Sequence, residues 1–146
     1  MEQHDLLFVY GTLRAGGGCT TGRVLEKYGV LLGPGTFNGK LYDLGGFPGA
    51  VASIIPRDLV KGELFQLDNP AVLLPFLDKY EGCGGIAPLF RRDLSEIWLD
   101  SGAGAMAWIY LCSRSISGSP IIESGDYLEY LSNICSPELK EGIAIL

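Results

Sequence analysis

The amino-acid sequence predicts an α+β protein with a compact mixed β-barrel, or a curled sheet, flanked by a few short helices. Many short apolar segments alternate with turn residues, and only two longer segments have clear helical spacing. Glycine accounts for 21 residues, about double its ordinary share of roughly 7%. The glycines follow no G-X-Y period, so they indicate tight turns between strands. Because no repeat or linker divides the chain, we expect one domain over residues 1–146.

The chain is expected to begin with a strand and a short helix. Leu6–Tyr10 has the continuous apolar character of a fully buried strand. Gly16–Gly18 predicts a loop, after which Thr20 and Thr21 can cap a short helix that runs through Glu26.

Turn residues divide the next region into several expected strands. Gly33–Gly35 interrupts the apolar segment Gly29–Phe37 and predicts a strand with a bulge or bend. Asn38-Gly39 is a strong two-residue hairpin signal, so we expect the chain to reverse there and return as Lys40–Leu44. A turn and two more strands are expected after it: Gly45–Gly49, Ala50–Ile55 and Leu59–Leu67.

The first clear helix is expected between Asn69 and Glu81. Pro70 suits the first helical position and Gly82 suits the position just past the end. Apolar residues recur at helical spacing on one face, at Leu73, Leu77 and Tyr80. Pro75 conflicts with this pattern, because a proline inside a helix removes a backbone donor and clashes with the preceding turn. We therefore expect a 3₁₀ turn first and a short helix that restarts at Pro75.

A hairpin and a second helix are expected in the rest of the chain. Two alternating segments, Phe90–Leu99 and Ala105–Cys112, predict strands joined by the loop Asp100–Gly104. A polar loop, Ser113–Ser119, precedes a helix predicted over Gly125–Ile134. The segment Ser136–Leu146 is weakly patterned, and it is expected to form a short packed helix or to lie over the body.

Composition excludes several classes of partner. The formal charge is −6 and no basic cluster exceeds Arg91-Arg92, which argues against a nucleic-acid interface. No apolar stretch reaches the roughly 18 residues that a membrane span needs. Glu2 and Asp5 stand where a secretory signal has basic residues, so we expect a soluble, cytoplasmic protein.

Metal and cofactor chemistry are also disfavoured. His4 is the single histidine, and it lies close to the N-terminus, which disfavours His-based nucleophilic catalysis and zinc binding. Gly16–Gly18 precedes no G-K-[ST] and is not a phosphate loop. The four cysteines form no C-x-x-C pair; free thiols are favoured over two disulfides, and the residues are Cys19, Cys83, Cys112 and Cys135. We expect no metal and no cofactor.

Two positions are candidates for chemistry. Tyr10-Gly11-Thr12 ends the first strand, where backbone N–H groups of a tight loop can hold a carboxylate or an oxyanion; an ordinary strand-ending turn is the alternative. Glu81 closes an amphipathic helix, where the macrodipole and partial burial would raise its pKa toward the range useful for proton transfer. A solvated last-turn glutamate is the other interpretation, and spacing alone leaves both open.

Two further segments have two interpretations each. Arg91 and Arg92 point in alternate directions along one strand, so one of them can pair with a carboxylate in a pocket, although an edge-strand charge is the simpler account. Phe47-Pro48 can be a substrate wall or a plain hydrophobic turn.

Five motifs together resemble the γ-glutamylcyclotransferase-like family, and in particular its γ-glutamylamine cyclotransferase or AIG2-like branch. In chain order they are Phe8–Arg14, Gly46–Val51, Val60–Phe65, Leu77–Gly82 and Ser124–Tyr127. Each fragment alone is weak, but five in the family's order make a specific signal. One departure stands out, because Phe90 precedes Arg91 where the family commonly has a tyrosine.

The resemblance implies a compact mixed barrel without metal or organic cofactor, and an enzyme that releases 5-oxoproline and an amine from a γ-glutamyl amine or peptide. It implies that Tyr10, Gly11, Thr12 and Leu13 bind the γ-glutamyl group and that Glu81 is the general acid/base. Tyr42, Tyr110 and Tyr127 are further candidates for the pocket wall. The alternatives are a non-catalytic module that binds a γ-glutamyl metabolite, and a γ-glutamyl acyl transferase or hydrolase. No protein partner is indicated, and a monomer is favoured.

Overall fold

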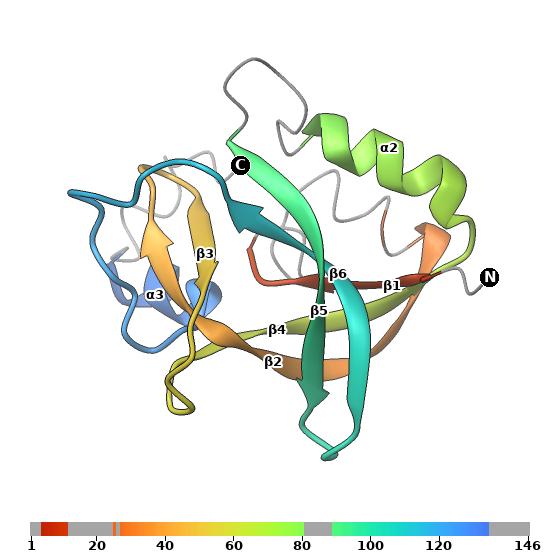
Figure 1. The fold of residues 1–146 in the computed structure, drawn as a ribbon, viewed down its shortest axis with the longest axis horizontal. Helices are drawn as coiled ribbons and strands as arrows, with labels where there is room; N and C mark the ends of the chain where they lie inside the picture. The colour runs from red at the N-terminus through yellow and green to blue at the C-terminus, as the bar shows by residue number, and fades with distance from the viewer. Residues whose placement is uncertain (1–3, 12–24, 26, 81–88, 135–146) are drawn as a thin grey trace.

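The structure is a computed structural model that describes residues 4–11, 25, 27–80 and 89–134. Six strands and two helices of these residues form the body of the molecule (Figure 1). In chain order they are β1 (Leu6–Val9), β2 (Gly29–Asp43), β3 (Pro48–Ala52), β4 (Leu59–Leu67), α2 (Pro70–Tyr80), β5 (Phe90–Leu99), β6 (Gly104–Cys112) and α3 (Tyr127–Ile134). The short helix expected through Glu26 and the segment Ser136–Leu146 fall largely or wholly outside the described residues.

Five of the strands close a mixed barrel. Each strand pairs with the next around the ring β1–β4–β2–β5–β6, and β6 pairs back onto β1. Four pairings are antiparallel, whereas β1 and β6 run parallel, with Leu7 opposite Trp108. β3 lies beside the ring and pairs with β2 and β6. The predicted mixed α+β barrel is confirmed.

β1 is buried on both faces, as its continuous apolar run predicts. Phe8 and Tyr10 belong to the apolar cluster inside the barrel, which also receives Tyr127 of α3. Leu7 and Val9 belong to a second cluster, which α2 covers with its leucines. Figure 1 shows α2 lying along one side of the barrel and α3 lying at the other end.

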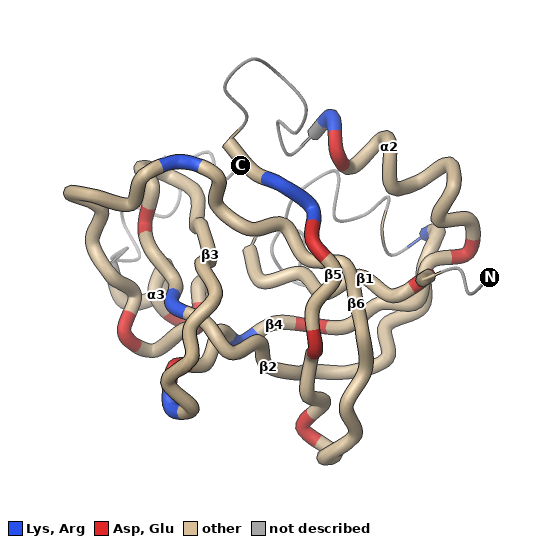
Figure 2. Tube along the Cα trace, viewed as in Figure 1, with Lys and Arg blue, Asp and Glu red and all other residues tan. Residues whose placement is uncertain are grey.

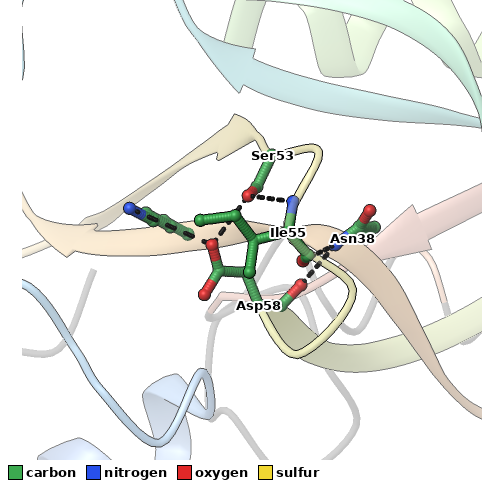
Figure 3. Close-up of polar contacts among 5 residues, drawn as sticks. Asn38, Ser53, Ile55 and Asp58 are labelled. Atoms are coloured by element: carbon green, nitrogen blue, oxygen red, sulfur yellow. Dashed lines mark hydrogen bonds and ion pairs between the residues drawn. The ribbon is translucent and has the colours of Figure 1, made fainter.

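The predicted hairpin at Asn38-Gly39 is wrong, because β2 continues through this dipeptide without reversing. The Asn38 side-chain amide donates hydrogen bonds of 2.8 Å to the carbonyl oxygens of Ile55 and Asp58 (Figure 3). A Cβ atom at Gly39 would lie 2.4 Å from the Val51 carbonyl oxygen. Asn38 therefore holds the loop before β4 against β2, and Gly39 allows the backbone of β3 to approach closely. Neither residue makes a turn.

The chain reverses instead at Gly45-Gly46, between β2 and β3. Both glycines have positive φ, 104° and 100°, which side chains disfavour. β3 ends at Ala52, so the expected strand Ala50–Ile55 is displaced toward the turn, and Ile55 lies in the loop before β4. The bulge predicted near Gly33 is confirmed by the register shift between Leu31 and Gly33.

The predicted interruption of the first helix is also wrong, since α2 runs continuously through Pro75. The proline removes one helical hydrogen bond and costs about 3 kcal/mol relative to alanine. Three leucines outweigh that cost, because burying each contributes roughly 1.5–3 kcal/mol. They are Leu73, Leu74 and Leu77, which are 7%, 7% and 0% exposed.

The predicted strand Leu59–Leu67, the second hairpin and the last helix are confirmed. The β5–β6 hairpin begins and ends within one residue of the predicted bounds. α3 begins after Asp126, whose carboxylate accepts a hydrogen bond of 3.2 Å from the Glu129 backbone N–H, as an N-cap does. Among the described residues, no helix has the length and apolar character needed to cross a bilayer. Charged residues are dispersed along the described chain (Figure 2).

Candidate functional site

The end of β1 is fixed by the hydroxyl group of Tyr10. Its side chain is 6% exposed. The hydroxyl donates a hydrogen bond to the Tyr110 carbonyl oxygen in β6 and accepts one of 3.2 Å from the Ala50 N–H in β3. Tyr10 therefore joins three strands at the point where the candidate loop begins, and the backbone binds its hydroxyl from two sides.

Gly11 permits a close contact between this loop and the β2–β3 turn. A Cβ atom at Gly11 would lie 3.0 Å from Cγ of Pro48, the first residue of β3. Pro48 is buried, so a larger residue at position 11 would push one of the two segments away. Thr12, Leu13 and Glu81, the other principal candidates, lie outside the described residues.

Tyr110 connects the end of β1 with the last turn of α2. While its carbonyl accepts from Tyr10, its hydroxyl donates a hydrogen bond of 2.7 Å to the Asp78 carboxylate. Asp78 lies on α2, three residues before Glu81 in the sequence. The side chain of Tyr110 is 4% exposed, so it holds neighbouring elements together from within the structure. Its role as a pocket wall stays a prediction.

Arg92 completes the cluster around Asp78. Its Nε and Nη2 atoms donate hydrogen bonds of 2.7 and 3.1 Å to the two carboxylate oxygens, a bidentate pair. The guanidinium also lies 4.3 Å from the ring centroid of Trp108, which is within cation–π range. The expected pairing of one of these arginines with a carboxylate is therefore confirmed for Arg92, which is partly buried and joined to Asp78.

The Asp78 carboxylate is favoured in its charged form. Burial acts to raise its pKa, but hydrogen bonds from Arg92 and Tyr110, together with the charge of Arg92, hold that pKa below the usual value. The cluster therefore contains a fixed ion pair at neutral pH. Sequence reasoning missed Asp78, since its partners come from β5 and β6.

Phe47 and Phe90 pack against one another beside this cluster. Their ring centroids are 6.2 Å apart in an edge-on arrangement, and Phe90 is 5% exposed. Phe90 stands where the family commonly has a tyrosine, and its ring lies in the apolar cluster beneath α2. The contact supports the interpretation of Phe47-Pro48 as a hydrophobic turn.

Tyr127 is the first residue of α3, and Tyr42 lies near the end of β2. Tyr127 is 1% exposed, and its hydroxyl donates a hydrogen bond of 3.2 Å to the Gly46 carbonyl oxygen. Tyr42 is half-buried on β2 and forms an isolated bridge with Ile121. Both residues flank the β2–β3 turn. Their contribution to a pocket wall stays a prediction.

A second anchored carboxylate, Asp43, was also missed from the sequence. It accepts hydrogen bonds from the Tyr130 hydroxyl at 2.7 Å and from the Gly45 N–H at 2.9 Å. Burial acts to raise the pKa of Asp43, but the bonds from Tyr130 and from the backbone of Gly45 and Gly46 hold that pKa below its usual value. An aspartate two residues before a glycine pair was the available signal, because such side chains cap turns.

The residues that could ligate a metal are scattered in the described part of the chain. There, no three histidine, cysteine or carboxylate side chains gather in one place. Cys112 is a buried free thiol, and the other three cysteines fall outside the described residues.

Comparison with known proteins identifies the family. The family model described as gamma-glutamyl cyclotransferase, AIG2-like, matches residues 7–129, a region that contains all five motifs. The chain belongs to the AIG2-like gamma-glutamylcyclotransferase family. Membership of this family indicates an enzyme.

Individual relatives agree in sequence and in fold. The gamma-glutamylcyclotransferase family protein YtfP of Escherichia coli K12 is 33% identical over 127 residues, covering 84% of this chain and 96% of YtfP. The solution structure of E. coli YtfP superimposes with a TM-score of 0.59 over 86% of this chain and 97% of YtfP, at 33% identity.

Two more distant structures share the fold alone. An AIG2-like protein from Mus musculus has a TM-score of 0.63 at 20% identity, covering 83% of this chain and 88% of the mouse chain. YkqA from Bacillus subtilis has a TM-score of 0.68 at 23% identity; the match covers 92% of this chain but only 44% of YkqA.

Proposed function

We propose that the protein is a cyclotransferase that converts a γ-glutamyl amine or γ-glutamyl peptide to 5-oxoproline and the released amine. The observation that carries this proposal is the double role of Tyr110, which holds the exit of β1 through Tyr10 and the last turn of α2 through Asp78. The two segments that the family motifs assign to substrate binding and to proton transfer continue from these two points.

The reaction suits a site without a nucleophilic side chain. The substrate's own α-amine attacks its γ-carbonyl carbon, a new C–N bond closes a five-membered ring, and the original amide C–N bond breaks. Holding both groups of one molecule in a folded geometry supplies much of the acceleration. The active site therefore needs to position the substrate, accept a proton and stabilise an oxyanion.

We assign the proton transfers to Glu81. An ammonium group cannot attack, so a carboxylate must take a proton from the α-amine and then deliver one to the departing amine. Glu81 directly follows Tyr80, the last residue of α2 as described. Consecutive Cα atoms lie about 3.8 Å apart, so the helix that Asp78 fastens to the barrel restrains the position of Glu81.

We assign substrate binding to the loop that begins at Tyr10 and Gly11 and continues through Thr12 and Leu13. Backbone N–H groups in a tight loop can stabilise the negative charge that develops on the γ-carbonyl oxygen. The anchored hydroxyl of Tyr10 and the limited space between Gly11 and Pro48 support this role, because they restrain the start of the loop before substrate arrives.

The test is the variant Glu81→Gln, which keeps the size of the side chain and removes its proton-accepting group. The purified protein is incubated with γ-glutamyl amines, γ-glutamyl dipeptides and glutathione, and products are identified by mass spectrometry. We expect the wild type to release 5-oxoproline and the variant to lose turnover by about 100-fold or more, with its melting temperature retained. Glu96→Gln, at an exposed position on β5, is the matched control.

Each alternative outcome has a distinct meaning. Wild-type turnover in Glu81→Gln would contradict the assignment of the acid/base. Release of free glutamate would indicate a hydrolase, and a new γ-glutamyl amide would indicate an acyl transferase. Tight binding without any product would indicate a module that only binds the metabolite.

A further inference from the structure

A continuous series of contacts runs from β3 to the last turn of α2. It passes from the Ala50 N–H to the Tyr10 hydroxyl, from there to the Tyr110 carbonyl, and from the Tyr110 hydroxyl to Asp78. We propose that Asp78, Arg92 and Tyr110 are positioning residues that hold the exit of β1 and the end of α2 in one fixed relation. This inference rests on the proposed function, which places substrate binding and proton transfer in the segments that follow.

The Asp78–Arg92 pair has the geometry of an anchor. Two hydrogen bonds join the groups, their side chains are 27% and 22% exposed, and Trp108 supports the guanidinium from one side. Bidentate pairing fixes direction as well as distance. Restricted access to water also limits the screening that weakens ion pairs on the surface.

The neighbouring Arg91–Asp93 pair supplies a comparison within the same strand. One hydrogen bond of 2.9 Å from Nε joins these groups, and their side chains are 55% and 45% exposed. Pairs of this kind contribute little to stability. The two pairs therefore use adjacent arginines and the same kind of acidic partner, but of the two aspartates it is Asp78 that lies on α2 and joins this helix to the barrel.

Apolar packing alone does not supply this alignment. α2 rests on the barrel through leucine side chains, and such contacts are non-directional, so they resist separation more than sliding or rotation. Asp78 directly follows the fully buried Leu77 in α2, and its carboxylate receives donors from two strands. These two donors therefore fix the rotation of α2 about its own axis and the position of α2 along the barrel.

Misalignment of this kind would affect turnover more than binding. A displacement of about 1 Å can lower a rate by about 100-fold when the reacting groups must meet in a defined geometry. We therefore expect Asp78→Asn to lower kcat by roughly 10-fold or more while changing KM by less than about 3-fold. Asp93→Asn should leave both constants within about 2-fold of the wild type.

A second variant tests the connection through Tyr110. Tyr110→Phe removes the hydrogen bond to Asp78 but keeps the carbonyl that accepts from Tyr10. We expect it to reproduce part of the kcat loss with the same small change in KM. Melting temperatures identify folded protein, and kcat is expressed per folded molecule. Unchanged kcat in both Asp78→Asn and Tyr110→Phe would overturn the inference.

Backbone amide exchange supplies a readout that does not depend on turnover. In Asp78→Asn, exchange should accelerate by about 5-fold or more at Ala50 and in the last turn of α2 relative to Asp93→Asn. Exchange at wild-type rates in both places would overturn the inference even if the enzyme is active. Accelerated exchange in a protein whose wild type forms no 5-oxoproline would contradict the proposed function and leave the positioning network standing.

Discussion

At the scale of single residues, the hydroxyl of Tyr10 stabilises the barrel because it forms hydrogen bonds with two backbone groups, the Tyr110 carbonyl and the Ala50 N–H. Replacing Tyr10 with Phe removes both contacts and keeps the ring in the core. We expect the free energy of unfolding to fall by about 1–3 kcal/mol, the usual cost of removing a partner from buried polar groups. Urea denaturation measures this loss.

Tyr28→Phe is the control for this measurement, because Tyr28 is 47% exposed. Its substitution should change the free energy of unfolding by less than about 0.5 kcal/mol. Equal effects of the two substitutions would contradict the role given to the Tyr10 hydroxyl.

Residue-level prediction from the sequence succeeds where the signal is local. Tyr10-Gly11 stands out because it follows a buried run directly. Asp78 and Asp43 cannot be recognised in this way, because their tyrosine partners lie 32 and 87 positions away in the sequence. The intervening sequence does not predict that these side chains come into contact. The pairing of Arg92 was open for the same reason: alternation on a strand predicts a direction but not a partner.

At the scale of elements, α2 carries a proline that its packing tolerates. Pro75 lies well inside the helix, whereas Pro70 occupies its first position, where a missing N–H costs nothing. Pro75→Ala should raise the free energy of unfolding by roughly 1–3 kcal/mol, because it restores one helical hydrogen bond at an exposed position.

Pro70→Ala is the control within the same helix, and it should change stability by less than about 1 kcal/mol. Thermal and urea denaturation of both variants give the comparison. A loss of stability in Pro75→Ala would show that the proline is itself required for the packing of α2.

Element bounds follow from the sequence where two signals agree. β4 and the β5–β6 hairpin have alternation and turn residues that point to the same bounds. The hairpin predicted at Asn38-Gly39 was wrong because a glycine is compatible with two different structures. It permits a turn, and it also permits a close backbone approach inside a strand. The second structure depends on Val51, which becomes a neighbour only after β2 and β3 pair.

At the scale of the whole molecule, two anchored aspartates make the free energy of unfolding depend on pH. The pKa values of Asp43 and Asp78 are lower in the folded protein than the value near 4 expected in the unfolded chain. As the pH falls below that value, the unfolded chain binds more protons at these two positions than the folded protein does. The contribution of the two aspartates to the free energy of unfolding is therefore complete above about pH 4–5, and it is lost as the pH falls through their folded pKa values.

Urea denaturation between pH 6 and pH 3 tests this dependence. The double variant Asp43→Asn/Asp78→Asn should be less stable at pH 6, and its stability should decline less steeply toward pH 3 than that of the wild type. Asp100→Asn, in the exposed β5–β6 turn, should keep the wild-type slope. Parallel curves for the wild type and the double variant would refute the account.

The parallel pairing of β1 with β6 has a consequence for the order in which the protein is made. A ribosome releases Leu7 long before Trp108, yet the two residues face one another in the closed ring. During synthesis, the edge of β1 that pairs with β6 stays unpaired until β6 has been made. Contacts between residues so far apart in the sequence also form slowly. The nascent chain thus carries an open strand edge until residues 104–112 emerge, and that interval is when capture by a chaperone would protect it most.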